Sequence, residues 1–206
     1  MVDHTFIYTG AVRKIKEIIA TGEMGDIYYF DSVRVNLGLF QHDINVIWDL
    51  APHDLSIMDY LFEKYPIAIS VFGASHLEQN LENIAYLNLL FDDTLIGDIH
   101  VDWLAPVKLR RTMISGTRKM IVYDDMETSE KIKVYDAGAY ITTSPENIYH
   151  KPIQYRTGDM YAPKLDQREA LSVECEHFIE AIQDGIQPVT DGQAGRRIVS
   201  MLEAAQ

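Results

Sequence analysis

The sequence predicts an α+β domain over residues 1–206, with a largely antiparallel, open β-sheet and helices on one face. Three observations lead to this prediction. The first 62 residues alternate helical and extended patterns, residues 67–135 form a run of short strands, and two amphipathic helices follow. Helices that are separated along the chain from a block of strands typically cover one face of an antiparallel sheet.

The N-terminal segment predicts a helix followed by a strand. Apolar residues recur at helical spacing over residues 11–21, and Gly22 is a natural stop. Residues 27–35 are rich in aromatic and β-branched side chains, which strands favour. Residues 36–46 have no clean period and are expected to form a loop.

Residues 49–62 predict a second helix. Asp49 is expected to cap it, because a side-chain oxygen can accept a hydrogen bond from the first free backbone donors. Pro52 would then fall in the first turn, where no backbone donor is needed.

The central segment predicts a series of antiparallel strands, because short turns cannot connect parallel neighbours. In the third strand, alternation places Ile99, Val101 and Trp103 on one side and Asp98, His100 and Asp102 on the other. No Gly-x-Gly-x-x-Gly motif occurs, and no strand–helix alternation suggests parallel strands. The expected strands are 67–74, 84–91, 96–104, 109–115, 119–123 and 131–135.

The C-terminal third predicts a long irregular segment, 137–165, and then two helices. Asp166-Gln167-Arg168-Glu169 is a capping box that opens the first helix. Its apolar stripe is expected to face the core, with a buried Cys175, and Gly185 should end it. The last helix should begin near Asp191. The stripe consists of Leu171, Cys175, Phe178 and Ile182.

Composition excludes several classes of protein. Eighteen Lys and Arg against thirty-one Asp and Glu give a net charge of −13, which disfavours nucleic acid as a partner. No apolar stretch approaches the roughly 18–20 residues that cross a bilayer, and the N-terminus does not resemble a signal peptide. The single cysteine cannot form an internal disulfide, so we expect a cytoplasmic protein.

Asp49 and His53 are the strongest candidates for chemistry. Residues four apart lie one turn from each other on a helix, and a carboxylate beside an imidazole favours its action as a general base or acid. The competing interpretation is structural, with Asp49 as a helix cap and His53 as a hydrogen-bonded core histidine.

Other polar clusters allow more than one interpretation. The histidines do not show the spacing of a zinc site, so no metal is predicted. Asp98, His100 and Asp102 fit a ligand, the solvated side of a half-covered sheet, or a polar dimer face. Lys108, Arg110 and Arg111 could hold an anionic substrate or protect an edge strand from aggregation.

Four stretches together resemble the C-terminal domain of the Gfo/Idh/MocA oxidoreductase family. The stretches are Gly22-Glu23-Met24-Gly25-Asp26-Ile27; Trp48-Asp49-Leu50-Ala51-Pro52-His53-Asp54; Ile114-Ser115-Gly116-Thr117 with Val122-Tyr123-Asp124-Asp125; and Glu174-Cys175-Glu176-His177-Phe178-Ile179 with Pro188-Val189-Thr190-Asp191-Gly192. Their order and spacing match the family over nearly all 206 residues. The resemblance implies the C-terminal fold that is also found in dihydrodipicolinate reductase and glyceraldehyde-3-phosphate dehydrogenase.

The resemblance also implies a function. Family members oxidise hydroxyl groups of sugars, nucleotide sugars or cyclitols with NAD or NADP, which a Rossmann domain binds. His53 would be the general acid/base and Asp49 its support. Asn36, Asp43, Asn45, Lys108 and Arg110 would lie near the substrate.

The family's dinucleotide-binding segment is missing from the 206 residues, so we expect this chain alone to bind no dinucleotide and to be inactive. Ile198, Met201 and Leu202 of the last helix should then lose part of their cover. A homodimer or higher oligomer through the sheet is expected. The alternative hypothesis is a non-catalytic sugar-binding or oligomerisation module; an unrelated hydrolase ranks last because no nucleophile motif is present.

Overall fold

The computed structural model describes residues 1–38, 40–77, 81–141 and 153–206. The elements, in chain order, are the 3₁₀ helix η1 (Thr5–Tyr8), α1 (Gly10–Ala20), β1 (Ile27–Val35), α2 (Val46–Phe62), β2 (Ala68–Ala74), β3 (Ile84–Leu90), β4 (Ile96–Asp102), β5 (Leu109–Gly116), β6 (Met120–Asp124), β7 (Ile132–Tyr135), β8 (Gly138–Ile141), β9 (Ile153–Arg156), β10 (Met160–Tyr161), α3 (Ala170–Asp184) and α4 (Gly192–Ala205).

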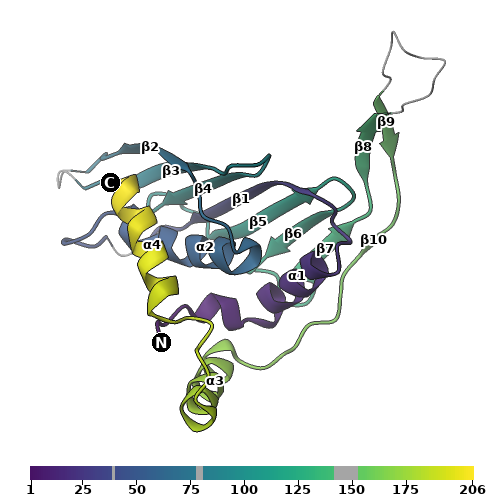
Figure 1. Cartoon of the computed structure of the whole chain (residues 1–206). Coiled ribbons are helices and arrows are strands. Elements are labelled where there is room, and N and C mark those ends of the chain that lie inside the picture. Colours follow the sequence, from purple (N-terminus) through teal and green to yellow (C-terminus); the bar gives the residue numbers. More distant parts are fainter. Residues whose placement is uncertain (39, 78–80, 142–152) are drawn as a thin grey trace.

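A large, mostly antiparallel sheet organises the molecule. In the described part of the chain its strand order is β10-β7-β6-β5-β1-β4-β3-β2, and β8 pairs with β9 in a separate ribbon. Helices α1, α2 and α4 lie on one face of the sheet, whereas the β8–β9 ribbon extends away from it (Figure 1). The predicted α+β class, with an open sheet and helices on one face, is confirmed.

One strand pair departs from the expected pattern. β1 lies between β4 and β5, antiparallel to β5 but parallel to β4. The expectation that no parallel strands occur was therefore wrong. The chain between β1 and β4 contains α2 and the β2–β3 hairpin, which is long enough for the crossover that a parallel pair requires.

Strand alternation separates a buried face from an uncovered one. Ile99 and Val101 of β4 and Trp103 just after it share one side, as predicted, and all three are buried. The opposite side has no helix over it in the described structure, and we call it the open face. It includes Asp31, Val33, Asp98, His100, Met113 and Val122, which are cross-strand neighbours in the register of β4, β1, β5 and β6.

Helix α2 begins about one turn earlier than expected. Asn45, not Asp49, is the N-cap, and its side-chain oxygen accepts a hydrogen bond from the backbone N–H of Trp48 at 3.1 Å. Pro52 consequently lies inside the helix and not in its first turn. The earlier start leaves Asp49 available for a contact with the sheet.

The two C-terminal helices differ from the prediction in whether their apolar sides are buried. Ile198, Met201 and Leu202 of α4 are buried, so the predicted loss of cover at the last helix was wrong. α3 instead exposes its apolar stripe, with Phe178 at 49% and Ile182 at 66%, and Cys175 is exposed, not buried. α3 lies away from the sheet and packs mainly on η1 (Figure 1). The helix was predicted correctly, but the stripe faces solvent.

Two predicted boundaries near α3 also differ from those in the structure. Glu169, not Asp166, caps the helix, with its carboxylate accepting from the N–H of Ser172 at 3.2 Å. The expected irregular segment 137–165 contains β8, β9 and β10, and its residues 142–152 lie outside the described residues. Among the described helices, none is long and apolar enough to cross a membrane.

Candidate functional site

Asp49 and His53 both project from the first half of α2, as the spacing predicted. The carboxylate of Asp49 accepts a hydrogen bond from the indole N–H of Trp103, at 2.9 Å, which anchors it to the end of β4. The half-buried His53 ring meets the Phe6 ring edge-on, with 5.1 Å between centroids. Asp49 therefore acts on His53 through its charge, whereas the hydrogen bond of its carboxylate is made with Trp103 at the end of β4.

A buried ion pair lies beside His53. The Arg34 guanidinium donates from Nε to Asp54 Oδ2 at 2.6 Å and from Nη2 to Asp54 Oδ1 at 3.2 Å. Ser32 Oγ donates to the same carboxylate at 2.8 Å. With only 5% and 2% of the two charged side chains exposed, this pair holds α2 firmly to β1.

Phe6 of η1 brings these groups together. The guanidinium carbons of Arg34 and Arg110 lie 4.4 and 5.6 Å from the centroid of its ring, within the range of cation–π attraction. Arg110 also contacts Asp125, with Nη1 3.4 Å from Oδ2. His53, Arg34 and Arg110 thus surround one aromatic ring, although they come from three different elements.

The surroundings of His53 favour the neutral imidazole. Burial is the largest cause that lowers its pKa, and the positive charge of Arg34 lowers it further. Asp54 raises the pKa, Arg110 lowers it and Asp49 raises it, in decreasing order of influence, and the net direction is downward. A neutral imidazole at pH 7 can accept a proton from a hydroxyl group.

Among the other predicted site residues, Asn36, Asn45 and Lys108 lie at the same end of the sheet but differ in their contacts. Asn36 follows β1 and donates its backbone N–H to Asp102 O at 3.0 Å. Asn45 is buried as the α2 cap and also donates from Nδ2 to Glu82 at 3.0 Å. Asp43 and Lys108 are exposed. Because β1 ends beside the start of β5, Asn36 and Lys108 adjoin the strand ends next to Arg110, whereas Asn45 lies at the start of β3 through its contact with Glu82.

Sequence reasoning missed Phe6, Arg34 and Asp54. Arg34 follows Phe30 and Ser32 at a spacing of two, so strand alternation places it on the same side as the buried Phe30. A charged residue at a core-facing strand position signals a buried partner. Phe6 gave no such signal, because its role depends on where η1 lies.

No group of side chains suited to holding a metal occurs within the ranges that the structure describes. A dinucleotide does not fit the described site either. The strand-to-helix turn that cradles a pyrophosphate needs closely spaced glycines, and the segment between β1 and α2 offers only Gly38. A Cβ added at Gly38 would lie 2.9 Å from Asn36 Nδ2, so the space beside this glycine is already taken by a side chain.

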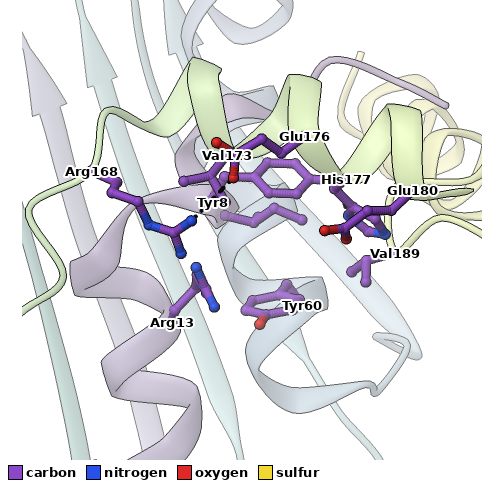
Figure 2. Close-up of a pocket in the computed structure, with 10 residues that line it drawn as sticks. Tyr8, Arg13, Tyr60, Arg168, Val173, Glu176, His177, Glu180 and Val189 are labelled. Atoms are coloured by element: carbon purple, nitrogen blue, oxygen red, sulfur yellow. Dashed lines mark hydrogen bonds and ion pairs between the residues drawn. The ribbon is translucent and has the colours of Figure 1, made fainter.

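A polar cavity of about 360 Å³ lies under α3, away from the predicted site residues. Figure 2 shows Arg13 and Arg168 pointing toward one another at one end and Tyr8 and His177 near the other. Arg168 already pairs with Glu176, at 3.1 Å, and Tyr8 shares hydrogen bonds with His177 and Thr190. These internal contacts already engage Arg168, Glu176, Tyr8 and His177, so His53 is the better candidate centre.

The fold and site together define an open-sheet α+β domain that carries an imidazole on a covering helix. Residues 12–122 match the model of the GFO/IDH/MocA C-terminal domain, which is more than half of the chain. The chain therefore belongs to this family, and the resemblance noted in the sequence is confirmed.

Solved structures show the same fold at low sequence identity. They include UDP-N-acetylglucosamine 3-dehydrogenase from Acidithiobacillus ferrooxidans (19% identity, TM-score 0.78, 98% of this chain and 59% of that one). Aldose-aldose oxidoreductase from Caulobacter crescentus is 14% identical, with a TM-score of 0.79 over 100% of this chain and 60% of that one. A levoglucosan dehydrogenase in complex with NADH is 15% identical, with a TM-score of 0.76 over 100% of this chain and 62% of that one. This chain thus spans about three fifths of their length. No curated protein sequence matches it.

Proposed function

We propose that this chain is the substrate domain of an NAD(P)-dependent oxidoreductase that acts on a hydroxyl group of a sugar, nucleotide sugar or cyclitol. The observation that carries the proposal is His53, a half-buried imidazole kept neutral by burial and by Arg34. Family membership and the names of the related structures support the reaction class. We also propose a cytoplasmic location.

In the proposed reaction His53 is the general base that accepts the proton of the hydroxyl group. Oxidation of a carbinol releases a hydride from carbon and a proton from oxygen, and the neutral imidazole accepts that proton. Asp49, fixed by Trp103, supplies a negative charge that helps to stabilise the resulting imidazolium. Asn36, Asp43, Asn45, Lys108 and Arg110 are the proposed substrate neighbours, with Asn45 acting through the cap of α2.

The hydride acceptor would be held outside these 206 residues, because the described site does not fit a dinucleotide. We therefore expect the isolated chain to be inactive. Calorimetric titration of the purified chain with NADH tests this. No heat of binding at millimolar NADH is the expected result, whereas saturable binding at micromolar NADH would overturn this division of roles.

Replacing His53 by Ala tests the chemical role. In a preparation that shows NAD(P)-linked turnover, His53→Ala should lower kcat by roughly 10²–10⁴-fold, the usual contribution of a general acid or base, while the dissociation constant of the cofactor stays the same. Steady-state kinetics and a cofactor titration provide both readouts. His100→Ala on the open face is the matched control and should retain turnover. Unchanged turnover in His53→Ala would remove His53 from the mechanism.

A second candidate function is a non-catalytic assembly or sugar-binding module. The uncovered sheet favours assembly, because its open face combines apolar Val33, Met113 and Val122 with polar residues. Both candidates predict a homodimer or higher oligomer. The two candidates differ in one expected result. Only the oxidoreductase hypothesis predicts that sugar is oxidised once a dinucleotide-binding partner is supplied.

A further inference from the structure

Two arginines face each other across neighbouring strands next to His53. Arg34 of β1 and Arg110 of β5 are direct partners in the antiparallel register, and both contact the ring of Phe6 on the helix-covered side. Like charges directly opposite each other in a sheet are unfavourable. Their placement opposite each other beside His53 points to a role beyond holding the strands together.

The neutralising carboxylates only partly offset these charges at the imidazole. Asp54 accepts from Arg34 Nε and Nη2, but Arg34 Nη1 is buried and finds no acceptor among the described residues. Asp125 lies 3.4 Å from Arg110 and also accepts from Tyr123 Oη and Lys131 Nζ, at 3.2 and 3.1 Å. The carboxylate of Asp125 is thus shared among three donors.

We propose that Arg34 and Arg110 are positioning residues for His53: they gather on the Phe6 ring beside the imidazole and place two guanidinium groups next to it. Phe6 holds the three groups together, since the His53 ring is 5.1 Å from the same aromatic centroid. The inference rests on the proposed role of His53 as the base. It adds the reason why that base is uncharged when substrate binds.

Four charged groups act on His53, and they oppose each other in pairs. Asp49 and Asp54 come from its own helix, Arg34 from β1 and Arg110 from β5. Burial is the first cause of the low pKa of His53, followed by Arg34, and Arg110 acts in the same direction against the two carboxylates. Arg110 is the better residue to change, because it is partly exposed and Arg34 is not.

An NMR titration of the 206-residue chain tests the inference without any need for turnover. The imidazole signals are followed against pH, and the signal that disappears in His53→Gln is assigned to His53. Arg110→Gln should move the midpoint of His53 to higher pH, and Arg110→Lys, which keeps the charge, should restore it. Arg111→Gln is the matched control, since Arg111 lies on the other side of β5 and pairs with Asp124 at 3.0 Å.

The outcomes separate this inference from the proposed function. Equal midpoints in wild type, Arg110→Gln and Arg111→Gln would overturn it. Should Arg110→Gln not fold, Asp125→Asn supplies the opposite perturbation: it removes the carboxylate beside Arg110 and should lower the midpoint, and no change would again overturn the inference. A shifted midpoint together with full turnover in His53→Ala would uphold the electrostatic role and reject the catalytic one.

Discussion

At the residue scale, Asp31 and Asp98 form a like-charged pair. They are direct partners across the parallel β1–β4 pair on the open face. Burial raises the pKa of both carboxyl groups, and the charge of Asp31 adds to the effect at Asp98, whereas nearby His100 opposes it. The His100 ring is stacked on Tyr86, with 4.2 Å between centroids, which fixes it beside the pair. The ionised forms of both aspartates are therefore costly in the folded chain.

Asp98→Asn should consequently stabilise the protein at neutral pH. A carboxyl group whose pKa is raised by folding contributes stability below its unfolded pKa, about 3.9, and loses that contribution as pH rises through the folded pKa. Removing the charge should raise the free energy of unfolding by a few tenths to about 1 kcal/mol at pH 7. Urea unfolding at pH 7 and near pH 3.5 checks this, because the gain should vanish at the lower pH. A gain of equal size at both values would contradict the electrostatic explanation.

At the same scale, the sequence was sufficient to place Asp49 and His53 one turn apart on a helix. It could not show that Asp49 bonds to Trp103, because that contact joins residues 54 positions apart and depends on where β4 ends. The role of Phe6 was hidden for the same reason. Helical periodicity predicts which residues share a face, but not which group from another element meets that face.

At the scale of elements, α3 and α4 offer a direct comparison of an exposed and a buried isoleucine. Ile182 of α3 is 66% exposed, whereas Ile198 of α4 is 2% exposed. Ile198→Ala should cost about 2–5 kcal/mol of stability through lost burial and a cavity, while Ile182→Ala should change little. Thermal unfolding of the two variants measures the difference. A large loss for Ile182→Ala in the isolated chain would mean that the outer side of α3 is covered in solution.

The prediction of α3 illustrates which property of a helix the sequence cannot determine. Its apolar stripe and its final Gly185, which has a φ of 65°, indicate a helix with clear ends. The same stripe suggested burial because amphipathic helices normally turn that side to a core. Whether that core lies within the same domain cannot be decided from spacing.

At the scale of the whole molecule, the open face is the proposed surface for self-association. Val122→Glu places a charge on this face, where Val122 is the direct partner of Met113. If the wild type sediments as the proposed dimer or higher oligomer, this variant should sediment as a monomer at the same concentration, because an interface core tolerates charge poorly. Phe178→Glu on α3 is the control and should leave the dimer intact. Loss of the dimer in the control alone would place the interface on α3 instead.

Much of the overall fold could be predicted from the sequence because most of its strands are short and alternate between buried and less buried residues. The antiparallel hairpins β2–β3–β4 and β5–β6–β7 follow from their short connections. The position of β1 could not be predicted in the same way, since its two neighbours are 61 and 74 residues further along the chain. Such long-range pairing is decided by the packing of α2 and the hairpins.

The central position of β1 also has a consequence for how the protein emerges from the ribosome. β1 ends at residue 35, but β4 begins only at residue 96 and β5 at residue 109. At a synthesis rate of about 5–20 residues per second, the nascent strand waits several seconds without either of its neighbours. Phe30, which is buried in the finished fold, lacks both neighbouring strands during that delay, and apolar surface left uncovered in this way promotes aggregation.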